Sequence, residues 1–384
     1  MSLFPEIIED ILLRLPVKSL VRFKSASKTL YSLISESRFV NLQAKRASNN
    51  PKILLFSVSG TCQSLDYETP FGNTCAFVNL NIPRKVLKQV ELGVDVIGSC
   101  SGLVCIGSNF DHKLVIWNPC TGTHLVIPYP SDSFTYYSYG FGYDPSSECF
   151  KIVLVSLEER TIFQIFSSKS SSWRSLCCPY GSTYILVNYI GDSPAPLLNG
   201  ALHWLSYSKP QLPSTFLRPY EISSEFIALD LAKEKFQKLP MPQSIPNHRL
   251  VLGELGGCLS LLFSPSMDKV EIWAMKEYGV KASWSKLLNV FETEYGSIYD
   301  FWPLYLCRSR EVVGLQDGMK LKRWNIQDGK LVDTFNICEE LCEAFMYRAV
   351  VYAENLISPT DFNGELSILF YKHLAMHACN ILFS

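Results

Sequence analysis

The stretch LVIWNPCTGTHLVIP, residues 114–128, holds the pattern that decides the fold. An apolar run ends in an aromatic residue, Trp117, a polar turn follows, and a second apolar run closes the unit. Two short β-rich runs that flank a turn with glycine predict a β-hairpin. The stretch therefore predicts two antiparallel strands.

The same unit recurs along most of the chain, at TIFQIFSSKSSSWRSL (161–176), FIALDLAKEKFQKLP (226–240), VEIWAMKEYGVKASWSKL (270–287) and LKRWNIQDGKLVDTFNI (321–337), with a degenerate copy at CQSLDYETP (62–70). The equivalent positions are Asp66, Trp117, Phe166, Leu229, Trp273 and Trp324, which lie 51, 49, 63, 44 and 51 residues apart. A period near 50 is typical of the four-stranded blades of a β-propeller.

A further apolar stretch precedes each hairpin and supplies the remaining strands of a blade, as in GSCSGLVCI (98–106), YGFGYDP (139–145), LNGALHWLS (198–206) and LGELGGCLSLLF (252–263). Glycines there permit close backbone approach near the axis. We predict an all-β propeller of six blades, closed by strands around 350–358 that pair with residues 52–57. A seventh blade would require a hairpin at 366–373, and a pair of β-sandwiches is the alternative fold.

The first 48 residues follow a different, helical period. Their net charge is +4, against −5 for the remainder. Apolar residues at positions 7, 8, 11, 12 and 15 form one helical stripe. Pro16 ends this helix. Ser27 and Ser37 are placed to cap two later helices, and residues 49–51 (Asn-Asn-Pro) form a linker. This predicts three to four short helices in a domain of residues 1–48, followed by a β domain of residues 49–384.

The helical segment LFPEIIEDILLRLPVKSLVRFKSASKTLYSLI, residues 3–34, resembles an F-box, and the run RLPVKSL (14–20) is its most specific part. The resemblance implies binding of the Skp-type adaptor of cullin-based ubiquitin ligases. The chain departs from the family at Ser25-Ala26, where Cys-Val is usual, and at Leu30, where Trp is usual. The adaptor-binding residues implied by the match are Pro5, Ile8, Ile11, Leu12, Leu15, Pro16, Leu20, Phe23, Lys24, Ser27, Lys28, Leu33 and Ile34.

The β segments, in their order and spacing, resemble the kelch-like F-box-associated domain of plant F-box proteins. In that family the domain is thought to recruit a target protein. The resemblance implies a substrate-recognition subunit of a Skp-cullin-F-box ubiquitin ligase, with ubiquitin transferred by the conjugating enzyme of the complex. The implied partners are the adaptor, through it a cullin scaffold, and a target. A ligase-independent interaction scaffold and a propeller enzyme are the alternatives.

Composition excludes several other classes. Lys and Arg number 35 and Asp and Glu 36, which leaves no basic surplus for nucleic acid. Apolar stretches such as that at 258–263 are far too short to span a membrane. Thirteen cysteines without a C-x-x-C pair indicate no disulfide framework or zinc site. We expect a reduced protein of the cytoplasm, the nucleus or both, without a cofactor.

Possible catalytic groups have a structural interpretation. GSCSG (98–102) has the shape of a nucleophile elbow, but Leu103 continues a strand, so Cys100 is expected to pack. His203 is expected to be a satisfied core histidine. We interpret residues 140–142 (Gly-Phe-Gly) as a turn and 233–235 (Lys-Glu-Lys) as a solvated turn. His373 with His377, and the carboxylates at 292, 294 and 300, are expected to lie on the surface. We therefore predict no catalytic or metal site.

Overall fold

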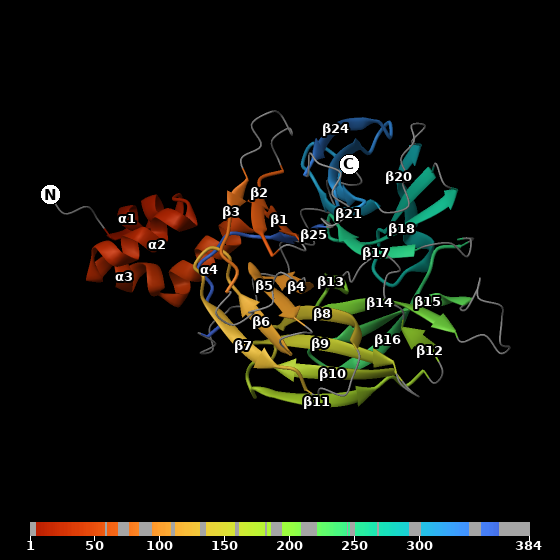
Figure 1. Cartoon of the computed structure of the whole chain (residues 1–384), viewed down its shortest axis with the longest axis horizontal. Coiled ribbons are helices and arrows are strands. Elements are labelled where there is room, and N and C mark those ends of the chain that lie inside the picture. The colour runs from red at the N-terminus through yellow and green to blue at the C-terminus, as the bar shows by residue number, and fades with distance from the viewer. Residues whose placement is uncertain are drawn as a thin grey trace.

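The chain forms a small helical domain beside a ring of β-sheets (Figure 1). The computed structural model describes residues 5–57, 60–67, 77–83, 94–108, 112–130, 136–157, 161–180, 183–185, 194–208, 221–243, 245, 250–266, 269–291, 301–337 and 347–360. None of the helices in these ranges is long and apolar enough to cross a membrane. The residues at 292, 294, 300, 366–373 and 377, about which we made predictions, lie outside the described ranges.

The four predicted helices are present, and they are α1 (Pro5–Leu13), α2 (Val17–Ala26), α3 (Lys28–Ser35) and α4 (Ser37–Ala47). Ser27 caps α3 as predicted, because its hydroxyl oxygen accepts a hydrogen bond from the Thr29 amide at 3.2 Å. The prediction for Ser37 was wrong. Ser37 is the first residue inside α4, and Glu36 occupies the cap position without a side-chain hydrogen bond.

Six sheets follow, one for each predicted blade. Blade 1 pairs β25 (Tyr347–Tyr352), β1 (Lys52–Ser57), β2 (Cys62–Leu65) and β3 (Val78–Asn79) in that order. Blade 2 pairs β4 (Asp95–Cys100), β5 (Leu103–Ser108), β6 (Lys113–Trp117) and β7 (His124–Pro128). Blade 3 pairs β8 (Tyr136–Asp144), β9 (Cys149–Leu157), β10 (Thr161–Ser167) and β11 (Ser172–Cys177).

The remaining blades continue the ring. Blade 4 contains β12 (Thr183–Ile185), β13 (Leu197–Leu198), β14 (Ala201–Ser208), β15 (Glu221–Asp230) and β16 (Lys235–Pro240). Blade 5 pairs β17 (Leu250–Leu255), β18 (Cys258–Ser266), β19 (Lys269–Met275) and β20 (Trp284–Phe291), with a short 3-10 helix, η2 (Lys281–Ser283), before β20. Blade 6 pairs β21 (Phe301–Leu306), β22 (Glu311–Gln316), β23 (Lys320–Asn325) and β24 (Leu331–Asn336).

The ring is closed by the two ends of the β domain. Strand β25 pairs antiparallel with β1, so that Val350 lies opposite Leu54. The predicted closure is confirmed, but the strand lies earlier than predicted, because residues 353–358 leave the sheet. The first strands of neighbouring blades contact one another, as β25 contacts both β4 and β21. In blade 1 the first strand, β25, comes from the C-terminal end of the β domain, and the second strand, β1, follows α4. The helical domain therefore precedes β1 at the point where, in the other blades, a turn joins the first strand to the second.

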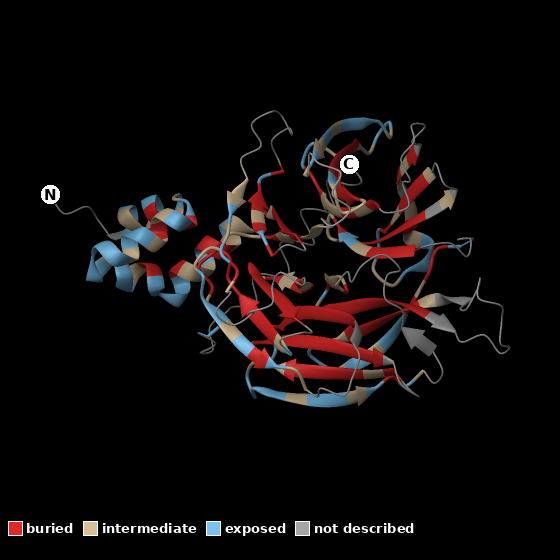
Figure 2. Ribbon diagram, viewed as in Figure 1, coloured by how far each residue is buried: buried red, intermediate tan, exposed pale blue. Residues whose placement is uncertain are grey.

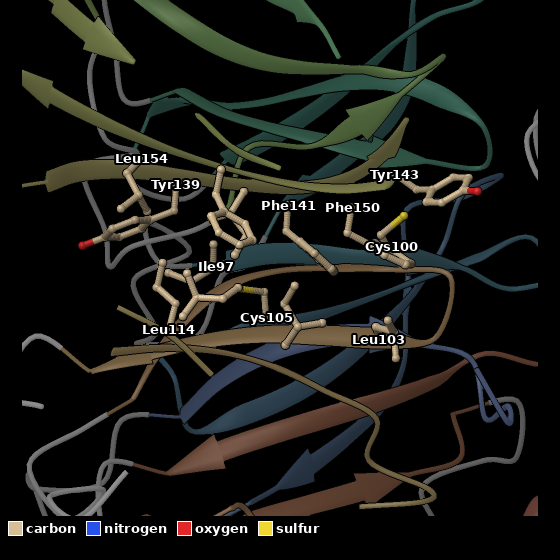
Figure 3. Close-up of a cluster of buried hydrophobic side chains, with 14 of the residues drawn as sticks. Ile97, Cys100, Leu103, Cys105, Leu114, Tyr139, Phe141, Tyr143, Phe150 and Leu154 are labelled. Carbon is tan, nitrogen blue, oxygen red and sulfur yellow. The ribbon is translucent and has the colours of Figure 1, made fainter. Parts of the chain in front are cut away.

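The core lies between the blades, and each of the six interfaces holds its own apolar cluster. Figure 3 shows the interface of blades 2 and 3, where Ile97, Cys105 and Leu114 face Phe141 and Leu154. Burying side chains of this size is worth about 1.5–3 kcal/mol each.

The predicted equivalence of the three tryptophans is confirmed. Trp117, Trp273 and Trp324 each lie in the third strand of a blade and pack against the preceding blade. The hairpins that contain them are therefore third and fourth strands, as the repeat predicted.

Of the two predictions that cover residues 140–142, the strand is confirmed and the turn was wrong. Gly140 and Gly142 lie inside β8. Blade 4 packs so closely against this strand that it leaves no room for a side chain at either position. A Cβ at Gly140 would stand 2.6 Å from a methyl carbon of Leu202. The turn predicted at 233–235 is present, with Lys233 and Lys235 exposed, but Glu234 is not solvated, because its carboxylate forms an ion pair with the buried Lys151 at 2.8 Å.

Candidate functional site

The four helices pack around a small apolar core. The side chains that these helices direct toward solvent form the candidate site. Leu12, Leu20 and Ile34, three of the predicted adaptor-binding residues, are buried against Val17 and Phe39. These three side chains shape the domain and hold its surface in place.

Other predicted residues do reach the surface. Ile11, Pro16, Phe23, Ser27 and Lys28 are exposed. A further group is half-buried and consists of Ile8, Leu15, Lys24 and Leu33. The side chain of Pro5 lies outside the described residues. The Ser27 hydroxyl forms the cap of α3, so the exposed apolar members are the candidates for a docking contact.

Sequence reasoning missed Ile7 and Tyr31. Ile7 precedes Ile11 by one helical turn, and both face solvent, with exposed fractions of 46% and 49%. Tyr31 of α3 is 59% exposed, and the ammonium group of Lys24 lies 5.9 Å from its ring centre. The spacing of Ile7 and Ile11 was a usable signal. We call Ile7, Ile11, Phe23 and Tyr31 the docking surface.

Exposed apolar side chains are concentrated in the helical domain. In the described part of the chain, nine large hydrophobic side chains are exposed, and five of them belong to α1–α4: Ile7, Ile11, Phe23, Tyr31 and Leu42. Figure 2 shows these helices projecting from the propeller with much of their surface exposed. Apolar surface concentrated on so small a domain is typical of an interaction site.

The departures from the F-box pattern are accommodated without disruption. Leu30 is half-buried and packs on the helical core, where a larger tryptophan is usual. Ser25 and Ala26 are exposed at the end of α2. The helical domain therefore forms with these residues in place.

The propeller residues that could have carried chemistry are structural. His203 is buried between the Pro196 carbonyl oxygen at 3.1 Å, which accepts from Nδ1, and the Tyr278 hydroxyl at 2.6 Å, which donates to Nε2. Burial lowers the pKa of His203 to about 4, so it stays neutral near pH 7. The predicted core histidine is confirmed.

Cys100 likewise has a packing role. It ends β4, and the turn at Ser101 and Gly102 leads into β5, which is a β-hairpin in place of the strand-turn-helix that a nucleophile elbow requires. Within the described residues, no group of three or more His, Cys, Asp or Glu side chains is arranged to hold a metal.

Comparison with known proteins agrees with this architecture. The family model of the F-box domain matches residues 1–42, and that of the F-box associated beta propeller domain matches residues 46–358. An F-box/kelch-repeat protein of Arabidopsis thaliana is 29% identical and covers 93% of this chain and 95% of its own length. The F-box protein CPR1 of the same plant is 26% identical, over 96% and 91%. The chain therefore belongs to the F-box proteins whose C-terminal domain is an F-box-associated β-propeller.

Proposed function

We propose that this protein is the substrate-recognition subunit of a Skp-cullin-F-box ubiquitin ligase. The F-box would bind a Skp-type adaptor, the adaptor a cullin, and the propeller a target protein. The observation that carries the proposal is the docking surface, which is apolar, exposed and placed on a domain matched by the F-box model. The names of the relatives support the same assignment.

In this role the chain would contribute proximity and orientation, while the conjugating enzyme would perform the chemistry. Holding two reactants together converts a bimolecular reaction into an effectively unimolecular one. The buried, neutral His203 and the packed Cys100 support a non-catalytic propeller. A location in the cytoplasm or nucleus stays a prediction.

Replacing Ile11 with Asp tests the adaptor contact. Ile11 is half exposed, so the substitution spares the helical core but would place a charge in a desolvated interface. A hot-spot loss of about 2 kcal/mol lowers affinity roughly thirtyfold. The measurement is the affinity of the purified adaptor for the full chain.

The matched control is Val126→Asp, which adds the same charge at an exposed apolar site of strand β7. It should leave adaptor affinity unchanged. Undiminished binding by the Ile11→Asp variant would refute the adaptor site and favour a ligase-independent scaffold.

For the target, we propose the end of the propeller away from the F-box. The turn after β4 contacts Asn355, which follows β25, and the turn after β21 contacts Asn49, which precedes β1. The end of the propeller that holds these two turns is therefore the F-box end. Because strands alternate in direction, the turn that contains His112 lies at the opposite end.

A photo-crosslinking residue can test this placement. At His112 it should capture a protein that accumulates and carries ubiquitin when the proteasome is inhibited. At Val280, which lies in a turn at the F-box end and is 43% exposed, it should not. Capture of such a protein only from Val280 would contradict the placement.

A further inference from the structure

A short segment after the closing strand joins the F-box to the propeller. Residues 353–358, which we call the junction segment, follow β25 without forming a strand. Leu356 is buried in the helical core, while the adjacent Ile357 is buried with Ala44 of α4 in the cluster of blades 2 and 3. Gln43 of α4 also donates from Nε2 to the Glu354 carbonyl oxygen at 3.3 Å. The segment is therefore part of both domains.

The junction segment is held by the side-chain amide of one propeller residue. Asn118 is fully buried, and its Nδ2 lies 2.7 Å from the Ile357 carbonyl oxygen, 3.1 Å from the Asn355 carbonyl oxygen and 3.3 Å from Asn355 Oδ1. Its Oδ1 accepts from the Cys120 amide at 2.8 Å and from the Thr121 amide at 3.2 Å. One side chain thus shapes a turn and binds the junction segment.

A second asparagine completes the contact. Asn355 Nδ2 donates to the Ser101 carbonyl oxygen at 2.8 Å, and Asn355 Oδ1 accepts from the Ile357 amide at 3.1 Å. Asn355 is 1% exposed. Both turns of blade 2 at the F-box end, after β4 and after β6, are therefore bonded to the junction segment.

The turn itself does not require an amide at position 118. In blade 4, Asp230 stands at the equivalent place, and its carboxylate oxygen accepts from the Ala232 amide at 2.9 Å and the Lys233 amide at 2.8 Å. In blade 6, Asn325 accepts from Gln327 in the same way at 2.8 Å. The acceptor oxygen is what such a turn needs. The amide nitrogen of Asn118 is surplus to the turn and serves the junction segment.

We propose that Asn118, together with Asn355, is a positioning residue that holds the F-box in one orientation on the propeller. Since the amide of Asn118 bonds carbonyl groups on either side of Leu356, it keeps that side chain in the helical core. The consequence for ubiquitin transfer rests on the proposed function: a fixed F-box would hold a bound target at one place relative to the conjugating enzyme.

The decisive variant is Asn118→Asp in the full chain. A carboxylate preserves the turn, as Asp230 shows, but it faces the three oxygen atoms that Nδ2 binds. The matched control is Asn325→Asp, which makes the same exchange in a turn that packs on blade 5, where a Cβ at Gly329 would lie 2.4 Å from the Asn289 carbonyl oxygen.

Three native cysteines report the result through peptide-resolved thiol labelling. Cys120 lies at the junction, where it packs against both the helical core and the cluster of blades 1 and 2. Cys177 is exposed and serves as the reactive reference, whereas Cys105 is fully buried inside blade 2 and reacts only if the propeller unfolds. Burial raises the pKa of Cys120 to about 12, so its labelling is slow while the junction is closed.

We expect Asn118→Asp to raise the labelling rate of Cys120 about tenfold or more, as an unsatisfied buried group would. The labelling rates of Cys177 and Cys105 should be unchanged, and in Asn325→Asp all three cysteines should be labelled at the wild-type rates. A new carboxylate beside Cys120 would by itself slow thiolate formation, so an increase reports opening. Unchanged Cys120 labelling would overturn the proposal.

If Asn118→Asp also exposes Cys105, Gln43→Glu provides the second variant. It removes the donor to the Glu354 carbonyl from the helical side and leaves the blades untouched. It must raise Cys120 labelling while Cys105 stays protected. Protection of Cys120 in this variant would then refute the positioning role.

A second experiment concerns the orientation itself. In a complex reconstituted with adaptor, cullin and conjugating enzyme, we expect wild type to modify itself on a narrow set of propeller lysines and Asn118→Asp on a wider set, with unchanged adaptor affinity. Identical lysine patterns would overturn the effect on transfer. Absence of any modification with wild type would instead count against the proposed function, while the thiol result would stand.

Discussion

The two domains of this protein differ in how far they bury their apolar and charged side chains. Among the described residues, the propeller has six apolar clusters between its blades, whereas the F-box has one small cluster and leaves Ile11 and Tyr31 exposed. The propeller also contains buried ions, such as Lys151, while the ion pair of Arg14 and Asp10 in the F-box lies on the surface. In the described residues, apolar burial is therefore more complete in the propeller than in the F-box.

The largest expected effect comes from the buried ions of the propeller. Lys151 of blade 3 pairs with Asp144 at 3.0 Å and with Glu234 of blade 4 at 2.8 Å. Its replacement by Met leaves the buried Asp144 without a cation and leaves Glu234 with the exposed Arg174 alone, and should cost about 3–5 kcal/mol in the free energy of unfolding. Urea denaturation measures this loss.

Arg174→Met is the control, because Arg174 also pairs with Glu234 but its side chain is 58% exposed. Its loss should cost about 1 kcal/mol or less. Equal costs for the two variants would show that burial does not distinguish them.

The second expected effect is a pH dependence from His203. Burial lowers the pKa of His203 from its ordinary 6.5 to about 4 in the fold, so the unfolded chain binds the proton first as the pH falls. The stability from neutral His203 is complete above pH 6.5 and is lost between 6.5 and 4, by about 3 kcal/mol in total. The protonation of Asp144, whose pKa is lowered to about 2 from 3.8, acts below that range.

The free energy of unfolding, measured by denaturation at several pH values between 7 and 4, should therefore fall less steeply for His203→Gln than for the wild type. The exposed His124 provides the control, and His124→Gln should keep the wild-type slope. A His203→Gln variant that loses stability as steeply as the wild type would disprove the assignment.

The third expected effect concerns the boundary between the domains. Gly102 and Gly122 both have positive φ, +74° and +76°. A Cβ at Gly102 would stand 2.5 Å from the Ala353 carbonyl oxygen, while nothing lies within 4 Å of one at Gly122. Alanine at Gly122 should cost about 1 kcal/mol for its backbone alone, and at Gly102 about 2 kcal/mol or more. Thermal unfolding of the two variants gives the comparison, and equal costs would mean that the junction segment yields freely.

The smallest expected effect lies in the F-box. Arg14 and Asp10 form an i,i+4 ion pair at 2.7 Å, with both side chains more than half exposed. Arg14→Ala should change the free energy of unfolding by about 0.5 kcal/mol or less. A loss as large as that of Lys151→Met would erase the contrast between the domains.

Much of the fold could be predicted because it repeats. The positions of Trp117, Trp273 and Trp324 located the third strand of three blades, since the same local environment recurs in each. The site was predicted less completely. Leu12 and Ile34 belong to the F-box pattern but lie in its core, because a motif records residues that shape a surface together with those that touch a partner.

The sequence by itself determined the helical segment, the strand pattern and the six units, because these follow from periods of 3.6 and 2 residues and from turn chemistry. Only the tertiary structure decided that Gly140 packs against Leu202 of the next blade, that Glu234 binds a lysine 83 residues away, and that Asn118 bonds a carbonyl 239 residues ahead. The reason is physical: periodicity reports which face of an element is buried, while the partner that a polar atom meets depends on how the whole ring closes.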